Sequence, residues 1–205
     1  MTDFFEVFGI ERRLAVDVAA LQRRFYELSR QWHPDFHQAA PPAEQARALE
    51  ESARVNAAYR ALRDPIARVE YLIRLEEGRD TKEGAAVKPK APPELLAEMF
   101  EIQEALETVR GEPVNGDARR GTLDEAARAT LGEQRDALVV RQAEAEVRIV
   151  GPLSRAWDAA APADRPKALG ALKEALATRA YLRTVIDDLG NALGEGTPHA
   201  AHRRD

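Results

Sequence analysis

The stretch Leu21 to Asp35, LQRRFYELSRQWHPD, decides the fold of the N-terminal half of this chain. Its apolar residues recur at i, i+4, i+7 and i+11, which places them on one face of a helix: Leu21, Phe25, Leu28 and Trp32. The opposite face is polar and largely basic, with Gln22, Arg23, Arg24, Glu27 and Arg30. Pro34 disfavours helical geometry at the preceding residue, so the helix should end there and present His33, Pro34 and Asp35 in a loop.

A second long helix is expected after this loop. Pro42 can start it, and its predicted inward face carries Ala48, Ser52, Val55, Tyr59 and Leu62. The two helices should pair antiparallel across the loop. Asp64 and Pro65 then break the second helix and begin another, which should end at Gly78.

A His-Pro-Asp tripeptide between a basic amphipathic helix and a helix containing VNAAYRALRDP, Val55 to Pro65, resembles the J-domain of DnaJ-type co-chaperones. The resemblance implies that the tripeptide and the nearby arginines bind the acidic surface of a DnaK-like ATPase. The implied chaperone-binding residues are His33, Pro34, Asp35, Arg23, Arg24 and Arg30. Asp35 would accept a charge-assisted hydrogen bond there. The alternative reading of the arginines is a solvated helix face, the usual explanation of surface charge.

Composition limits the classes of function. The chain has 205 residues, of which 44% are hydrophobic and 32% charged, as in a globular protein that buries a core. Its formal net charge of -5 gives no reason to expect generic binding to nucleic acid or an anionic membrane. The absence of cysteine excludes disulfides and thiolate ligation of a metal or cluster by this chain. Without a signal peptide or a stretch long enough to span a bilayer, we expect a cytoplasmic location, with the mitochondrial matrix as the alternative.

The sequence predicts two helical domains. Residues 1–78 form the predicted J-domain, beginning with a short helix that Asp3 caps and Gly9 ends. Residues 79–92 are poor in large apolar side chains and read as a linker. No run of alternating β-branched residues predicts a strand, so the fold should be all-α.

The second domain, residues 93–190, should be an antiparallel helical bundle. Its expected parts are a helix over 93–110, a turn-rich segment over 111–121, a long helix to about Val150 and a bend at Gly151 and Pro152. A short helix around Trp157 and a last long helix from Asp164 to Gly190 follow. The tail, residues 191–205, should be disordered.

This second half resembles the C-terminal domain of HscB-type J-proteins, which act in iron-sulfur cluster assembly. The resemblance rests on PPELLAEMFEIQEALE, Pro92 to Glu107, and AWDAA, Ala156 to Ala160, together with DFFEVFGI near the start. It implies two protein partners, the cluster scaffold protein IscU and a DnaK or HscA-type chaperone whose ATPase this chain stimulates. It implies no cofactor and no catalytic residue in this chain.

The helix predicted over 93–110 carries two apolar features. A stripe with helical spacing is sufficient to pack it into a bundle: Leu95, Met99, Ile102, Leu106 and Val109. Leu96 and Phe100 lie about 100° away from that stripe, close to two carboxylates, which is typical of a protein-binding patch. The open alternative is that the bundle buries a wider face here. By the resemblance, the scaffold-binding positions are Leu96, Phe100, Glu101 and Glu104, with Tyr181 as a further aromatic contact.

Other functions find weaker support in the sequence. His33 and His37 have the spacing of a helical metal site, but Pro34 between them and the lack of further ligands argue against one. No phosphate-binding loop, nucleophile elbow or metalloprotease helix is present. An enzyme is therefore the weaker hypothesis, and a general J-domain co-chaperone with a different protein client stays open.

Overall fold

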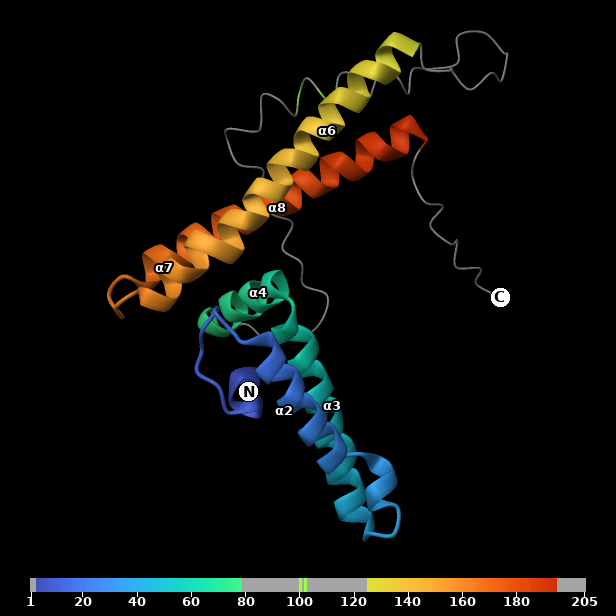
Figure 1. Ribbon diagram of the computed structural model, residues 1–205, viewed down its shortest axis with the longest axis vertical. Coiled ribbons are helices and arrows are strands. Elements are labelled where there is room, and N and C mark those ends of the chain that lie inside the picture. Colours follow the sequence, from blue (N-terminus) through green and yellow to red (C-terminus); the bar gives the residue numbers. More distant parts are fainter. Residues whose placement is uncertain (1–2, 79–99, 101, 103–124, 195–205) are drawn as a thin grey trace. The chain divides into compact units, whose positions relative to one another are not determined.

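The computed structural model describes residues 3–78, 100, 102 and 125–194 of the chain (Figure 1). The described residues form helices and turns without a strand, which confirms the predicted all-α class. The chain divides into two compact units, one formed by Met1–Ala86 with Val147–Lys173 and the other by Val87–Glu146 with Glu174–Asp205. The linker predicted at residues 79–92 lies outside the described residues and stays a prediction.

The helices of the N-terminal part begin where the sequence predicts. Their order is α1 (Phe4–Phe8), α2 (Val18–Gln31), the 3-10 helix η1 (Pro34–His37), α3 (Pro42–Arg63) and α4 (Pro65–Glu76). Asp3, Asp17 and Asp64 each accept hydrogen bonds from backbone N–H groups in the first turn of the following helix. Gly9 ends α1 with a φ of 66°, a conformation that glycine adopts without strain.

Helices α2 and α3 form an antiparallel pair, visible as the two long helices of the blue and teal region in Figure 1. The ring of Phe25 on α2 stacks on Tyr59 of α3, with centroids 4.1 Å apart and planes within 14°. Buried aliphatic residues from both helices continue this interface: Leu21, Leu28, Val55 and Leu62. The apolar stripe of the sequence is thus the packed face of α2, as predicted.

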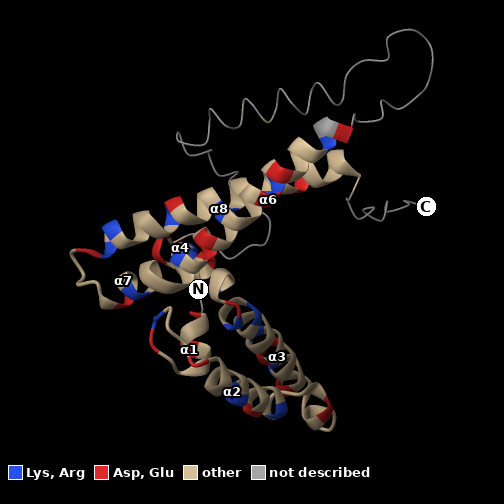
Figure 2. Cartoon of the chain, turned by 45° about the horizontal axis from the view of Figure 1, so that its top comes forward, with Lys and Arg blue, Asp and Glu red and all other residues tan. Residues whose placement is uncertain are grey.

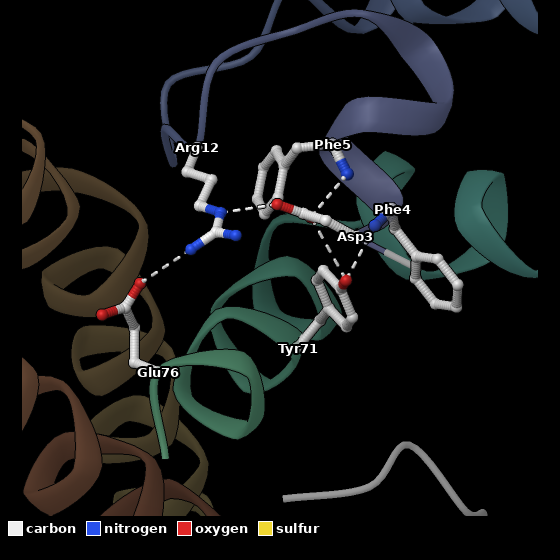
Figure 3. A network of polar contacts seen from close by, with 6 residues as sticks. All are labelled: Asp3, Phe4, Phe5, Arg12, Tyr71 and Glu76. Atoms are coloured by element: carbon white, nitrogen blue, oxygen red, sulfur yellow. Dashed lines mark hydrogen bonds and ion pairs between the residues drawn. The ribbon is translucent and has the colours of Figure 1, made fainter. Parts of the chain in front are cut away.

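A buried carboxylate joins α1 to α4 (Figure 3). Asp3 is only 3% exposed, yet its oxygens accept hydrogen bonds from Phe5 N–H, the Arg12 guanidinium and the Tyr71 hydroxyl. Tyr71 also accepts a hydrogen bond from Phe4 N–H at 2.8 Å and stacks on the Phe4 ring. Burial raises the pKa of the Tyr71 hydroxyl. The Asp3 carboxylate and the Tyr71 hydroxyl therefore have hydrogen-bond partners, which offset the cost of removing them from water.

The chain continues with α6 (Glu125–Arg148), the π-helical turn η2 (Ile149–Leu153), α7 (Ser154–Ala159) and α8 (Arg165–Leu193). The sequence predicts a bend at Gly151 and Pro152, but the helix passes through them as a π-turn. Proline lacks the N–H that a regular helix needs, and a widened turn accommodates that loss. The Ser154 hydroxyl donates to the Ile149 carbonyl at 2.6 Å, and the Ser154 backbone N–H donates to the same oxygen across the widened turn.

Residues of α7 hold the segment that leads into α2. The Asp158 carboxylate accepts hydrogen bonds from the backbone N–H groups of Leu14 and Ala15, at 2.7 and 2.8 Å. From the other side, the buried Arg68 of α4 donates to the carbonyl oxygens of Leu14 and Leu62. Burial lowers the pKa of Arg68, while the carboxylates of Asp64 and Asp158 act in the opposite direction. The start of α2 is thus fixed by polar contacts from residues far away in the sequence.

In the second unit, α6 and α8 run antiparallel around an aliphatic core. The core contains Ile102, Leu131, Leu138, Leu182, Val185, Leu189 and Leu193. An ion pair of 2.7 Å joins Glu146 of α6 to Arg179 of α8. Helix α8 continues three residues beyond the predicted end at Gly190, because Leu193 is buried in this core and Gly194, with a φ of 80°, terminates the helix. The expected tail beyond it lies outside the described residues.

Replacing Tyr71 by phenylalanine should lower the free energy of unfolding at neutral pH by about 1 kcal/mol, because Phe4 N–H and Asp3 each lose a partner. The raised pKa of Tyr71 also stabilises the fold below pH 10.0, its ordinary value, and this stabilisation is lost as pH rises past it. Thermal unfolding from pH 8 to about 11 should therefore show a shallower alkaline loss of stability in Tyr71→Phe than in the wild type. Tyr26→Phe, at a tyrosine that is 60% exposed, is the matched control. An identical alkaline slope in all three proteins would contradict the assignment.

Replacing Asp158 by alanine should destabilise the fold by about 2 kcal/mol, because two backbone N–H groups lose a charged acceptor. Asp158→Asn keeps one acceptor oxygen and should lose about half as much. Chemical denaturation of the full chain, followed by circular dichroism, measures both values. Equal stability of the alanine variant and the wild type would show that the Asp158 contact contributes nothing to the free energy of unfolding.

Candidate functional site

The His-Pro-Asp tripeptide lies in a tight turn between α2 and α3. Helix α2 ends at Gln31, and Trp32 caps it by donating its N–H to the Leu28 carbonyl. His33 is extended and caps η1, its Nδ1 accepting a hydrogen bond from Asp35 N–H at 3.3 Å. Pro34 occupies the first position of that 3-10 helix, where its missing N–H costs nothing. The predicted loop is therefore an ordered helical turn.

The functional groups of this turn face solvent. The side chains of His33 and Asp35 are 52% and 70% exposed. One Asp35 oxygen accepts a weak hydrogen bond from the Gln38 amide at 3.4 Å, and the other lies 3.7 Å from His33 Nδ1. Phe36, beside them, is 69% exposed. The Asp35 carboxylate thus retains acceptor capacity for a group from outside the chain.

The three predicted arginines of α2 are exposed. Figure 2 shows basic residues along this helix. Arg24 forms an exposed ion pair of 2.9 Å with Glu27, which solvent weakens. Within the described residues, Arg23 and Arg30 take part in no ion pair. The helix therefore offers cationic groups to a partner next to the turn, in the arrangement that the sequence predicts.

Contacts from α3 hold the other side of the turn, and the sequence analysis did not identify them. The Gln45 amide donates to the carbonyl oxygens of Gln38 and Ala40. The Arg47 guanidinium lies 5.6 Å above the Trp32 ring, a cation-π contact. A helical wheel assigns Trp32 to the core, but its side chain is half-buried and supports the turn. In the sequence, a role of Trp32 and His37 in supporting the turn is indicated by their positions close to Pro34, one before it and one after it.

The predicted scaffold-binding patch is described at only two of its positions. Phe100 is helical and 69% exposed, whereas Ile102, also helical, is 4% exposed in the core of the second unit. Tyr181 on α8 is half-buried against the same core. Leu96, Glu101 and Glu104 lie outside the described residues. Ile102 is buried and Phe100 is exposed, as expected of residues on different faces of the predicted helix. The binding role of the patch stays a prediction.

Over 3–78, 100, 102 and 125–194, no group of three histidine, aspartate or glutamate side chains is placed to hold a metal ion. No helix within these residues has the length and apolarity needed to cross a membrane.

Comparisons with known proteins agree with this arrangement. Residues 3–71 match the DnaJ domain family. The crystal structure of human co-chaperone protein HscB has 25% sequence identity and a TM-score of 0.59, covering 93% of this chain and 82% of that chain. Chaperone HscB from Vibrio cholerae has 24% identity and a TM-score of 0.52, covering 92% of this chain and 99% of that chain. The predicted resemblance to HscB-type J-domain co-chaperones is confirmed.

Proposed function

We propose that this J-domain co-chaperone binds an iron-sulfur cluster scaffold protein of the IscU type, delivers it to a DnaK or HscA-type chaperone and stimulates that chaperone's ATPase. The observation that carries the proposal is the ordered His33-Pro34-Asp35 turn, whose polar groups are exposed next to unpaired cations of α2. The similarity to HscB co-chaperones over most of the chain supports the choice of client.

The turn would act by direct contact with the chaperone. Asp35 is the acceptor for a charge-assisted hydrogen bond from an arginine of the ATPase domain. Arg23 and Arg30 would meet acidic groups of the same partner, which steers association and fixes its orientation. Since ATP is hydrolysed in the partner, the turn contributes by stabilising the partner's hydrolysing state.

The second unit would hold the scaffold. Phe100 supplies a large exposed aromatic side chain, the type of residue that dominates protein interfaces. Leu96, Glu101, Glu104 and Tyr181 complete the proposed surface by resemblance. The cluster is cargo of the scaffold, and this chain has no cysteine with which to ligate it.

Binding both partners at once explains why the two activities reside in one chain. A scaffold held by the second unit is present at high effective concentration when the turn engages the chaperone. A general J-domain co-chaperone with a different client is the second candidate, favoured by the fact that the family match itself covers residues 3–71 alone. Titration of the scaffold into the full chain separates the two, since only the first requires saturable binding.

Replacing Asp35 by asparagine should abolish stimulation of the chaperone ATPase, because the neutral amide loses the charge-assisted contact. Scaffold binding should be unchanged, because Asp35 is part of the turn and the proposed scaffold surface is in the second unit. Single-turnover ATPase assays and calorimetric titration with the scaffold measure the two effects. Glu70→Gln, which neutralises another exposed carboxylate, is the control. Equal loss of both activities in Asp35→Asn would contradict the division of labour.

Replacing Phe100 by alanine should weaken scaffold binding by at least tenfold, since a buried interface aromatic commonly contributes more than about 1.4 kcal/mol. Stimulation of the ATPase in the absence of scaffold should be unchanged. Val140→Ala, at a valine that is 58% exposed on α6, is the matched control for loss of an exposed apolar side chain. Unchanged scaffold affinity in Phe100→Ala would remove the proposed surface.

A further inference from the structure

His37 spans the gap between the two long helices just after the tripeptide. Its side chain is 17% exposed, far less than those of His33 and Asp35. Its Nε2 lies 3.0 Å from the carbonyl oxygen of Gln31, the last residue of α2. Its Nδ1 lies 3.6 Å from a carboxylate oxygen of Glu44, in the first turn of α3. One imidazole thus connects the end of α2 to the start of α3.

The ring is also held on its face. It stacks nearly parallel to the Trp32 indole, with planes within 15° and centroids 6.1 Å apart. Trp32 is itself covered by Arg47 of α3. Because a carbonyl oxygen only accepts hydrogen bonds, Nε2 carries the proton at Gln31 in the neutral ring. Nδ1 then faces the Glu44 carboxylate.

Charged groups lie around this position. Glu44 faces Nδ1 of the ring, and Arg47 lies over the Trp32 ring on which the imidazole stacks. On the tripeptide side, the side chains of Asp35 and His33 are largely exposed. The hydrogen bond to the Gln31 carbonyl is thus the polar contact that ties the ring to α2.

We propose that His37 is a positioning residue that fixes the His33-Pro34-Asp35 turn for chaperone binding; this inference rests on the proposed function. The hydrogen bond to the Gln31 carbonyl and the stack on Trp32 hold the segment that follows the tripeptide against the end of α2. Loss of the hydrogen bond should loosen the turn and weaken chaperone binding.

A purely space-filling role for His37 predicts different effects of substitution, and two variants distinguish it from a positioning role. His37→Phe retains an aromatic ring on Trp32 but loses both polar contacts. His37→Gln retains a donor for the Gln31 carbonyl and loses the aromatic ring. A space-filling role is preserved by phenylalanine, whereas the hydrogen bond of a positioning role is restored by glutamine.

The test measures stimulation of a DnaK or HscA-type ATPase by the full chain at one fixed pH. His37→Phe should need about fivefold more protein for half-maximal stimulation, the factor expected of one hydrogen bond, and reach the same maximal rate. His37→Gln should match the wild type.

A second readout on the free chain separates failure of this inference from failure of the proposed function. Amide hydrogen exchange at Phe36 and Ala40, whose N–H groups donate to the carbonyls of His33 and His37, should be about fivefold faster in His37→Phe. Amides of α4 should not change. If the wild-type chain stimulates no chaperone, the proposed function is overturned and the exchange rates alone decide the role of His37. Unchanged exchange at both amides, or equal ATPase behaviour of all three proteins, would overturn the inference.

Discussion

The packing of α2 against α3 is the constraint on which the rest of the first unit depends. The stack of Phe25 on Tyr59 and the aliphatic contacts beside it fix the two helices antiparallel. Their ends are therefore close enough for a short turn to join them. Because the apolar face of α2 is used in this packing, its arginines can only face solvent. The position of the turn and the exposure of the basic face therefore both follow from the amphipathic pattern of α2.

The candidate chaperone-binding turn is exposed, and hydrogen bonds from within the chain hold its backbone. Caps from His33 and Trp32, the Gln45 amide and the contacts of His37 fix the backbone around the tripeptide. Asp35 is left with an exposed carboxylate. A rigid turn lowers the entropy cost of binding, so a small contact can have a large effect on a partner.

The helices and their starts were predictable because they depend on local chemistry. Aspartate caps at Asp3, Asp17 and Asp64, the proline at position 42 and the spacing of apolar residues each act within one or two turns. Position 152 was predicted as a bend, because sequence rules treat proline as a break, while the structure widens one turn around it. Contacts between distant residues, such as Asp158 with Leu14 and Tyr71 with Asp3, leave no periodic signal in the sequence. The same holds for the bridge that His37 makes.

Under the proposed function the two units have different tasks. The first carries the tripeptide turn and the second carries Phe100, so one chain would bring a client and a chaperone together. Avidity of this kind arises without any new contact, provided both sites are occupied together.

The most direct measurement is the concentration of this chain that half-saturates stimulation of the chaperone ATPase, with and without the scaffold protein. The account predicts that scaffold lowers this concentration by at least tenfold and raises the rate beyond the sum of the separate effects. Strictly additive stimulation, with an unchanged half-saturating concentration, would contradict it.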